Sequence, residues 1–460
     1  MVNRLQHMTK RVVKAEQGET RRQATAKGGL VLAQRVAQRT GLWSGAKRCL
    51  PPRKDPTQGF PTKAVACAMV HGLLAGGRGF RAAESLRDDA ASLRMLGLSA
   101  APSAETTERV VKDVAARQPD AAGPNALLRS QCRRTLRELL RRELLGCEGF
   151  FTLWGDGSLL EVQGRRFDSI KTIKGRTGQM CAGVFVGPMV SGLRFALEGE
   201  GEKTVVMGLL ESAMRDVVEP LRLRRQTLVL LDSLYGGEPT FDQLETYRGA
   251  HYIVGVTNLA RARAVMNEMN DAAWFDTGAC RALNWDASGL AVAWLECEGW
   301  SRKRTMVCRR WRRAGEMIWE HAAVVTDLEP DEPRVAALMR RRGWNFAQAI
   351  WHLYSHKQAL ENQWKEMLID MGLHHPPSAR ARVNSVFHAL GAVAYNLSVA
   401  IRRLALVGAD RTMRLWRLRR ELFDLAAEAI HHGRKVVMRF IDSRHADVHR
   451  LLRAMERLRC

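Results

Sequence analysis

The feature that most constrains the fold is a change of pattern at Gly149, where helix-like periodicity gives way to short apolar runs. These runs have the length and the β-branched or aromatic content of buried strands. A turn-rich segment joins the second run to the third as a hairpin. Helical periodicity follows the third run and the fourth, at residues 204–218 and 239–247. The order predicts an α/β domain built on one sheet. The expected strands are residues 150–154, 180–186, 193–197, 227–231 and 251–256.

Two aspartates belong to these expected strands. Asp156 lies between Gly155 and Gly157, where we expect the first strand to loosen or turn, and Asp232 directly follows the run at 227–231. Ligands and metals in α/β sheets gather outside the carboxyl ends of strands, so the two carboxylates can converge if their strands are neighbours. An isolated aspartate is weak evidence, and the hypothesis depends on a third partner.

That partner is expected on a helix over residues 351–371. One stripe of this helix is apolar, and Tyr354, Lys357, Glu361 and Lys365 follow one another at steps of three and four on a second face. A carboxylate flanked by two cations stays ionised at neutral pH and could bind a metal. The alternative is an ordinary surface pattern of i, i+4 salt bridges.

The segment Tyr354, Lys357, Glu361, continued by Asn362 and Lys365, resembles the signature of the DDE transposases of bacterial insertion sequences, specifically the IS-four-like group. The resemblance extends from about residue 30 to about residue 403. It departs from the family at position 357, where lysine replaces the usual arginine, and at Leu368, where many members carry lysine. The implied fold is an α/β, RNase H-like mixed-sheet catalytic core with an inserted β-rich subdomain, preceded by a helical DNA-binding region.

The resemblance also implies an activity: cut-and-paste movement of an insertion sequence by metal-dependent DNA strand cleavage and strand transfer. Asp156, Asp232 and Glu361 would be catalytic and would hold two Mg²⁺ or Mn²⁺ ions, which such carboxylates suit. Tyr354, Lys357 and Lys365 would contact DNA. The implied partners are terminal inverted repeats, target DNA and a second copy of the chain in a synaptic complex. Two alternatives remain: a non-mobile RNase H-like nuclease or resolvase, and a domesticated, catalytically inactive DNA-binding protein.

The distribution of charge favours a polyanionic partner. The chain carries a net charge of +24, and residues 1–60 hold 13 Lys or Arg against 3 Asp or Glu, while residues 380–460 hold 17 against 7. Positive charge concentrated in this way suits DNA or RNA better than a membrane. The apolar segment at 386–401 is shorter than a bilayer span and is expected to be a buried helix.

The remaining composition indicates a reducing, cytoplasmic setting. Nine cysteines are scattered without a CxxC pair, so neither a zinc site nor a disulfide framework is expected. The N-terminus is basic but has no apolar stretch typical of a secretory signal.

Pattern changes along the chain predict six regions. Residues 1–28 within the first are expected to be a mobile basic arm. Residues 102–116 could be the recognition helix of a helix-turn-helix or a helix packed in a bundle. We expect most of the six tryptophans at 274–319 to be core residues, with a DNA-stacking surface as the alternative. With the roles that the resemblance implies, the regions are a basic arm with a short helix (1–60), a helical DNA-end-binding region (61–145), the first part of the core (146–256), the insertion (257–320), the second part of the core (321–405) and a basic helical C-terminal region (406–460).

Other acidic and histidine residues compete for the same site. Asp168, Asp242 and Asp327 also lie near the ends of expected elements, and Asp327 is the strongest competitor. His374 and His375 precede two prolines, which favours a helix-end turn over metal binding.

Overall fold

The computed structural model describes residues 12–17, 24–53, 59–142, 148–163, 166–432, 435–441 and 445–458 of the 460-residue chain.

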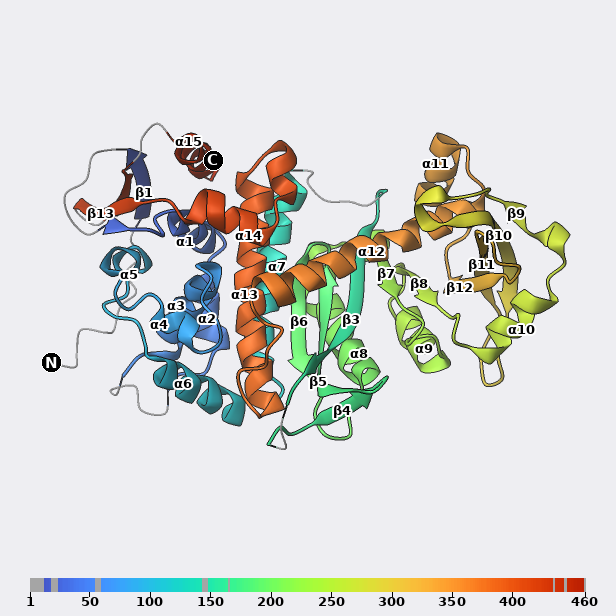
Figure 1. Ribbon diagram of the computed structural model, residues 1–460, viewed down its shortest axis with the longest axis horizontal. Helices are drawn as coiled ribbons and strands as arrows, with labels where there is room; N and C mark the ends of the chain where they lie inside the picture. Colours follow the sequence, from blue (N-terminus) through green and yellow to red (C-terminus); the bar gives the residue numbers. More distant parts are fainter. Residues whose placement is uncertain are drawn as a thin grey trace.

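A mixed β-sheet lies at the centre of the molecule (Figure 1). Its core strands follow the order β6, β5, β3, β7, β8 across the sheet. β5 runs antiparallel to β3 and β6, whereas β7 and β8 run parallel to β3. This topology confirms the RNase H-like mixed sheet expected from the sequence. The strands are β3 (Phe151–Glu161), β5 (Arg176–Val186), β6 (Met189–Phe195), β7 (Thr227–Leu231) and β8 (His251–Gly255), with the short β4 (Ile170–Ile173) paired to β5.

The inserted segment extends this same sheet. β12 pairs antiparallel with β8, so the last core strand is covered and its backbone groups are bonded on both sides. β11, β10 and β9 continue the sheet outward (Figure 1). The insertion is therefore β-rich, as expected, and continuous with the core. Its elements are α10 (Ala260–Glu268), β9 (Phe275–Asp276), β10 (Trp285–Leu295), β11 (Arg304–Arg313) and β12 (Glu320–Thr326), so the β-rich segment extends six residues beyond the expected boundary at 320.

Helices pack on the sheet and join it to the N-terminal region. α8 packs on β3, β5 and β6, while α13 contacts β6 and the helices α1, α3, α6 and α7. α12 runs from the insertion along the sheet toward α13 (Figure 1). These helices are α7 (Ala122–Arg141), α8 (Glu202–Ala213), α9 (Glu238–Thr246), α11 (Pro333–Arg342), α12 (Phe346–Asp370) and α13 (Ala381–Ala405).

The expected buried helix at 386–401 is confirmed within α13, and its polar residues have structural partners. Asn396 accepts from the backbone N–H of Val190 at 2.8 Å and donates to its carbonyl at 2.7 Å. The Ser385 hydroxyl accepts from the N–H of Phe195 at 2.9 Å. These bonds satisfy the free edge of β6 inside the core.

Across the described residues, every helix is too short or too polar to span a lipid bilayer.

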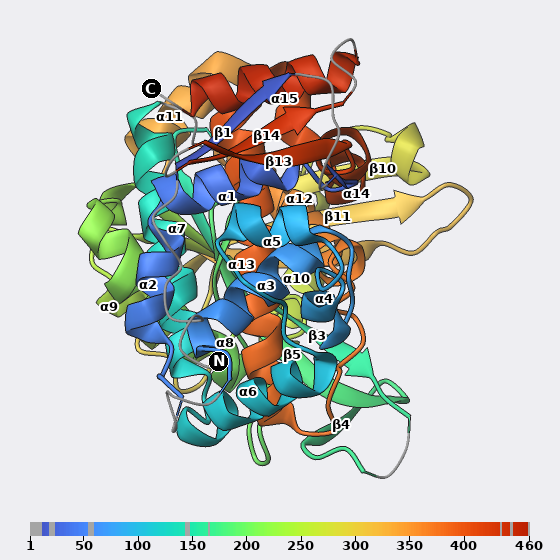
Figure 2. The same cartoon turned by 90° about the vertical axis from the view of Figure 1, so that its left-hand side faces the viewer.

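The N-terminal region is helical, as expected, and its helices lie against α13 (Figure 2). α6 begins at Ser103, whose hydroxyl accepts from the N–H of Thr106, and its apolar face packs on α3, α4 and α13. Of the two alternatives for this segment, the packing favours a bundle helix. The helices are α1 (Leu30–Arg39), α2 (Leu42–Cys49), α3 (Thr62–Leu74), α4 (Arg81–Glu84), α5 (Ala90–Leu96) and α6 (Ala104–Arg117).

The two ends of the chain form a second sheet, in the order β1, β14, β13, β2 (Figure 2). The expectation of a mobile arm over residues 1–28 is wrong for β1 and β2, while residues 1–11 and 18–23 of that arm lie outside the described residues. The expectation of a helical C-terminal region is wrong for β13 and β14. β13 and β14 pair with each other as an antiparallel hairpin, and the two N-terminal strands add to its edges, β1 to β14 and β2 to β13. A two-stranded hairpin is only marginally stable alone, so the added strands help to complete the sheet. The elements are β1 (Val12–Gln17), β2 (Ala24–Thr25), α14 (Leu415–Leu418), β13 (Ala427–His432), β14 (Lys435–Phe440) and α15 (Ala446–Arg457).

Candidate active site

The position of Asp156 follows from the register of β3 and β5. Asp156 pairs with Gly183 and, two residues earlier, Trp154 pairs with Phe185, so all four residues are on one face of the sheet. Trp364 of α12 covers this face: a Cβ on Gly183 would lie 2.6 Å from the Trp364 ring. The same ring packs edge-on against Phe185 at 5.7 Å. The absence of a side chain at Gly183 thus lets α12 lie directly beside Asp156.

The two glycines beside Asp156 have a different role from the one expected. β3 continues through Glu161, so Asp156 lies within the strand and the expected loosening or turn is absent. A Cβ on Gly155 would lie 2.3 Å from Val206, and one on Gly157 would lie 2.4 Å from the Glu202 side chain. The glycines therefore permit the close approach of α8 to the opposite face of β3.

Asp232 lies where it was expected, directly after β7. Its Oδ1 accepts from the backbone N–H of Leu234 at 2.8 Å, which holds the carboxylate in a turn. Tyr354 anchors α12 to the same strand end, because its hydroxyl donates to the carbonyl of Leu231 at 3.4 Å. The Tyr354 hydroxyl also approaches Gly255 of β8, where a Cβ would lie 3.0 Å away.

The helix that carries Glu361 begins with a capping box. Asn345 accepts from the N–H of Gln348, and the Gln348 side chain accepts from the N–H of Asn345. The expected helix at 351–371 is confirmed as α12, which begins five residues earlier and ends at Asp370. Its N-terminus is fixed by these two bonds, and its middle by Tyr354 and Trp364, so Glu361 is held between two anchored turns.

Lys357 links the expected site residues. Its Nζ donates to Glu361 Oε1 at 2.9 Å, and the side chain is buried, with 8% of the residue's surface exposed. Burial alone would lower the pKa of Lys357, but the bond to Glu361 and the charges of Asp156 and Asp232 outweigh it and raise the pKa. Lys357 is thus more buried than the lysine of an ordinary surface salt bridge, whereas the Glu361 side chain keeps 32% of its surface exposed. Lys365 makes no ion pair with Glu361 among the described residues, so the expected flanking by two cations holds on one side only.

The Asp156 carboxyl is an unusual acid. Burial raises its pKa to about 6, and the charges of Asp232 and Glu202 add to this effect. Lys357 and the N–H of Gly157, which donates to Asp156 Oδ1 at 2.9 Å, act in the opposite direction. A carboxyl in this setting gains strongly from any further positive charge.

Asp156 and Glu361 line one open cavity of about 450 Å³. Lys365, His374 and His375 also line it, and the two histidines lie in the turn after α12, as expected. Carboxylate oxygens are the ligands that Mg²⁺ prefers, so the chemistry of the donors suits such an ion. Within the described chain no three acidic, histidine or cysteine side chains are gathered closely enough to form a ready metal cluster. The ammonium of Lys357 supplies a positive charge close to Asp156, Asp232 and Glu361, the three expected metal ligands.

Sequence reasoning missed Glu202, the first residue of α8. Its Oε1 accepts from the hydroxyl of Tyr235, a fully buried residue, at 2.8 Å. Burial and the charge of Asp232 raise the pKa of Glu202, although the bond from Tyr235 opposes them. The carboxylate contacts Gly157, next to Asp156. A glutamate at a helix start is commonplace, so only the packing of α8 on Gly157 distinguishes this one.

The competing aspartates lie elsewhere. Asp327 accepts from the N–H of Tyr252 at 2.8 Å and contacts His251 at 3.1 Å. Both partners lie at the amino end of β8, whereas Asp232 follows the carboxyl end of the parallel strand β7. Asp168 accepts from the N–H of Ala381 at 2.7 Å at the start of α13. Asp242 is exposed on α9.

The tryptophans of the insertion are mostly not core residues, contrary to our expectation. Of the six at 274–319, Trp274 is buried, Trp294 has 67% of its surface exposed, and the others are partly buried. Arginines of β11 lie over several of them. Arg309 covers Trp285 at 4.4 Å, and Arg310 covers both Trp274 and Trp319 at 4.7 and 4.4 Å. The indoles therefore serve as platforms for cations on a partly exposed surface.

A family model described as "Transposase DDE domain group 1" matches residues 6–460. No curated protein matches the chain in sequence. Seven chains of solved structures match. One is described as the cryo-EM structure of a piggyBac transposase synaptic complex with hairpin DNA; it is 12% identical, has a TM-score of 0.42, and the match covers 89% of this chain and 83% of that chain.

Proposed function

The chain belongs to the family of transposases with a DDE domain, and on this premise we propose that it moves an insertion sequence by cut-and-paste cleavage and transfer of DNA strands. The observation that supports the proposal is the buried ammonium of Lys357, which is bonded to Glu361 at 2.9 Å and whose pKa is raised by that bond and by the charges of Asp156 and Asp232. Asp156 and Asp232 belong to two adjacent parallel strand segments, and Asp156 and Glu361 line an open cavity.

We assign Asp156, Asp232 and Glu361 as the residues that would hold two Mg²⁺ or Mn²⁺ ions. When bound, such ions activate a water or a DNA 3′-hydroxyl and stabilise the leaving oxygen of the phosphodiester. The surroundings of Asp156 support this role, because Lys357 and the Gly157 N–H only partly offset the effect of burial on its negative charge. A carboxyl with a pKa near 6 is stabilised in its ionised form by added positive charge. Lys357 would neutralise Glu361 until the site is loaded, because its ammonium is bonded to that carboxylate.

Lys357 and Lys365 are the proposed contacts to DNA phosphates. Lys365 lines the cavity with Asp156 and Glu361 and has no carboxylate partner in the described part of the chain, so its charge is free for a phosphate. For Tyr354, the bond to Leu231 supports a positioning role, because it ties the Glu361 helix to the strand that precedes Asp232. The partners would be double-stranded DNA at inverted repeats, target DNA and a second copy of the chain, in the bacterial cytoplasm.

The test is cleavage of DNA that contains the sequences flanking the gene, with Mg²⁺ supplied. Wild-type protein should cut at the ends of the element, and Asp156→Asn should bind the same DNA without cutting it. Asp242→Asn, an exposed aspartate on α9, is the matched control and should cut at the wild-type rate. Cutting by Asp156→Asn at that rate would refute the site. Cutting without strand transfer would indicate a nuclease or resolvase instead of a transposase.

A further inference from the structure

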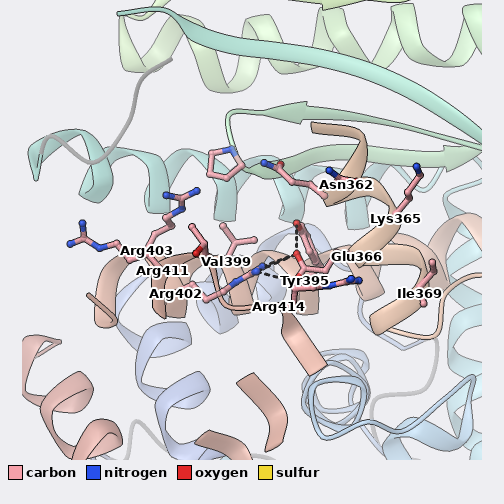
Figure 3. A pocket seen from close by; sticks show the side chains of 13 residues that line it. Asn362, Lys365, Glu366, Ile369, Tyr395, Val399, Arg402, Arg403, Arg411 and Arg414 are labelled. Atoms are coloured by element: carbon pink, nitrogen blue, oxygen red, sulfur yellow. Dashed lines mark hydrogen bonds and ion pairs between the residues drawn. The ribbon is translucent and has the colours of Figure 1, made fainter. Parts of the chain in front are cut away.

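A second pocket, of about 600 Å³, is shown in Figure 3. It shares part of its lining with the cavity lined by Asp156 and Glu361, which we call the carboxylate cavity. It is lined by α12, by α13 and by the segment 411–414 that follows α13. Five of its lining residues are cations: Lys365, Arg402, Arg403, Arg411 and Arg414. We call this hollow the basic pocket.

Only part of this positive charge is balanced within the protein. Glu366 forms a buried pair with Arg402 at 2.9 Å, and it also accepts from the N–H of Leu415 at 2.7 Å and from the Tyr395 hydroxyl at 3.3 Å (Figure 3). Arg402 donates in addition to the carbonyl of Met413 at 2.8 Å. Glu366 and Arg402 therefore bond to each other and to neighbouring groups of the protein, and their role in the pocket is structural.

Three cations of the basic pocket remain uncompensated. Among the described residues, Lys365, Arg403 and Arg411 make no ion pair with a carboxylate. Arg411 donates through Nε to the carbonyl of Leu406 at 3.1 Å, which leaves the outer end of its guanidinium without a bond in the described chain. Burial and the neighbouring charges of Arg402 and Arg411 lower the pKa of Arg403. Like charges gathered in a concave site without a protein counter-charge favour an external anion.

The basic pocket and the carboxylate cavity share two lining residues, Lys365 and Ile369 of α12. A DNA strand that leaves the carboxylate cavity past Lys365 therefore enters the basic pocket, which Arg403 and Arg411 line. Arginine is suited to a phosphodiester there, because its planar guanidinium can donate two parallel hydrogen bonds to phosphate oxygens.

We propose that the basic pocket binds the sugar–phosphate backbone of the DNA strand whose end is processed at the carboxylate cavity, an inference that rests on the proposed function. The ligand is a phosphodiester chain, bound through Arg403 and Arg411. Contacts of this kind position DNA and do not read its sequence.

The test compares Arg403→Gln/Arg411→Gln with wild type in binding to duplex DNA over a range of salt concentrations. Loss of two phosphate contacts should reduce the slope of log Kd against log salt by about 1 to 2 and weaken binding by about tenfold or more at low salt. Arg403→Lys/Arg411→Lys keeps both charges and should retain most of the slope. Arg222→Gln/Arg248→Gln is the matched control. Both residues are exposed and precede β7 and β8, away from the carboxyl end that carries Asp232.

A wild-type slope in the Arg403/Arg411 glutamine variant, or an equal reduction in the control pair, would overturn the proposal. The proposal would also be overturned if wild type bound poly-glutamate and the glutamine variant lost that binding while it still bound DNA like wild type. The basic pocket would then bind an acidic protein. If the double variant unfolds by circular dichroism, the single variant Arg411→Gln should lower the slope by about 1, and an unchanged slope refutes the contact.

The outcomes separate this inference from the proposed function. Wild-type protein that fails to cut DNA but shows the expected change in slope would refute the transposase mechanism and support the pocket. Wild-type protein that cuts, with a slope unaffected by the two substitutions, would refute the pocket alone. No binding of duplex DNA by wild type would refute both.

Discussion

Replacing Asp156 by asparagine should stabilise the protein while it abolishes strand cleavage. The Asp156 carboxylate is partly buried, and the opposing effects of Lys357 and the Gly157 N–H do not offset its burial and the charges of Asp232 and Glu202. Asparagine has nearly the same shape and its oxygen can still accept from Gly157. The substitution thus removes an unfavourable charge and leaves the packing of β3 in place.

The size of the effect follows from the pKa. A rise from 3.8 to about 6 corresponds to about 3 kcal/mol, at 1.36 kcal/mol for each pKa unit. Below pH 3.8 the carboxyl is protonated in both the folded and the unfolded chain. Between pH 3.8 and about 6 the unfolded chain ionises first, so the free energy of unfolding of wild type falls as the pH rises. Asparagine at position 156 does not titrate. The free energy of unfolding of the variant should therefore exceed that of wild type by nearly zero at pH 4 and by about 1 to 3 kcal/mol above pH 7.

The assay is urea unfolding of both proteins in EDTA at pH 4 and pH 7.5, with Asp242→Asn as an exposed control that should match wild type at both values. Adding Mg²⁺ at pH 7.5 should narrow or reverse the difference, because an ion that binds only the folded wild type stabilises it by mass action.

A variant that is less stable than wild type at pH 7.5 in EDTA would refute the electrostatic reasoning. Equal stabilisation at pH 4 and pH 7.5 would show that the gain has a cause other than loss of charge. If Mg²⁺ stabilises both proteins equally, Asp156 is not a ligand.

Three further outcomes are expected. Lys357→Arg should retain most of the cleavage rate, whereas Lys357→Ala should lose one to a few orders of magnitude, and a rate within about threefold of wild type would reduce Lys357 to a weak ion pair. Glu202→Gln, which keeps an acceptor for Tyr235, should raise the Mg²⁺ concentration needed for half-maximal cleavage, and an unchanged Mg²⁺ titration would leave Glu202 with a purely structural role. Gly183→Val should lower the urea midpoint by the equivalent of about 1 to 3 kcal/mol and slow cleavage together, because its Cβ would lie 2.6 Å from the indole that holds α12 in place; loss of stability at full activity would contradict this.

Local patterns were sufficient for the elements that carry the expected site. The strand before Asp232 and the helix around Glu361 could be predicted because an apolar run and a 3.6-residue period report burial directly. The order of strands and helices was sufficient for the mixed sheet. Whether the insertion would join that sheet could not be predicted, since the pairing of β12 with β8 depends on partners that are distant in sequence.

The sequence by itself determined which residue types this protein brings to the site: two strand aspartates, a helical glutamate and a lysine one turn before it. Only the tertiary structure decided their environment. It buries Lys357 among the acids, makes Gly155 and Gly157 the contact surface of α8, and brings Glu202 beside them. It also pairs β1 with β14 across more than 400 residues of sequence. The physical reason is that burial, charge coupling and strand pairing depend on neighbours in space, which periodicity along one segment does not specify.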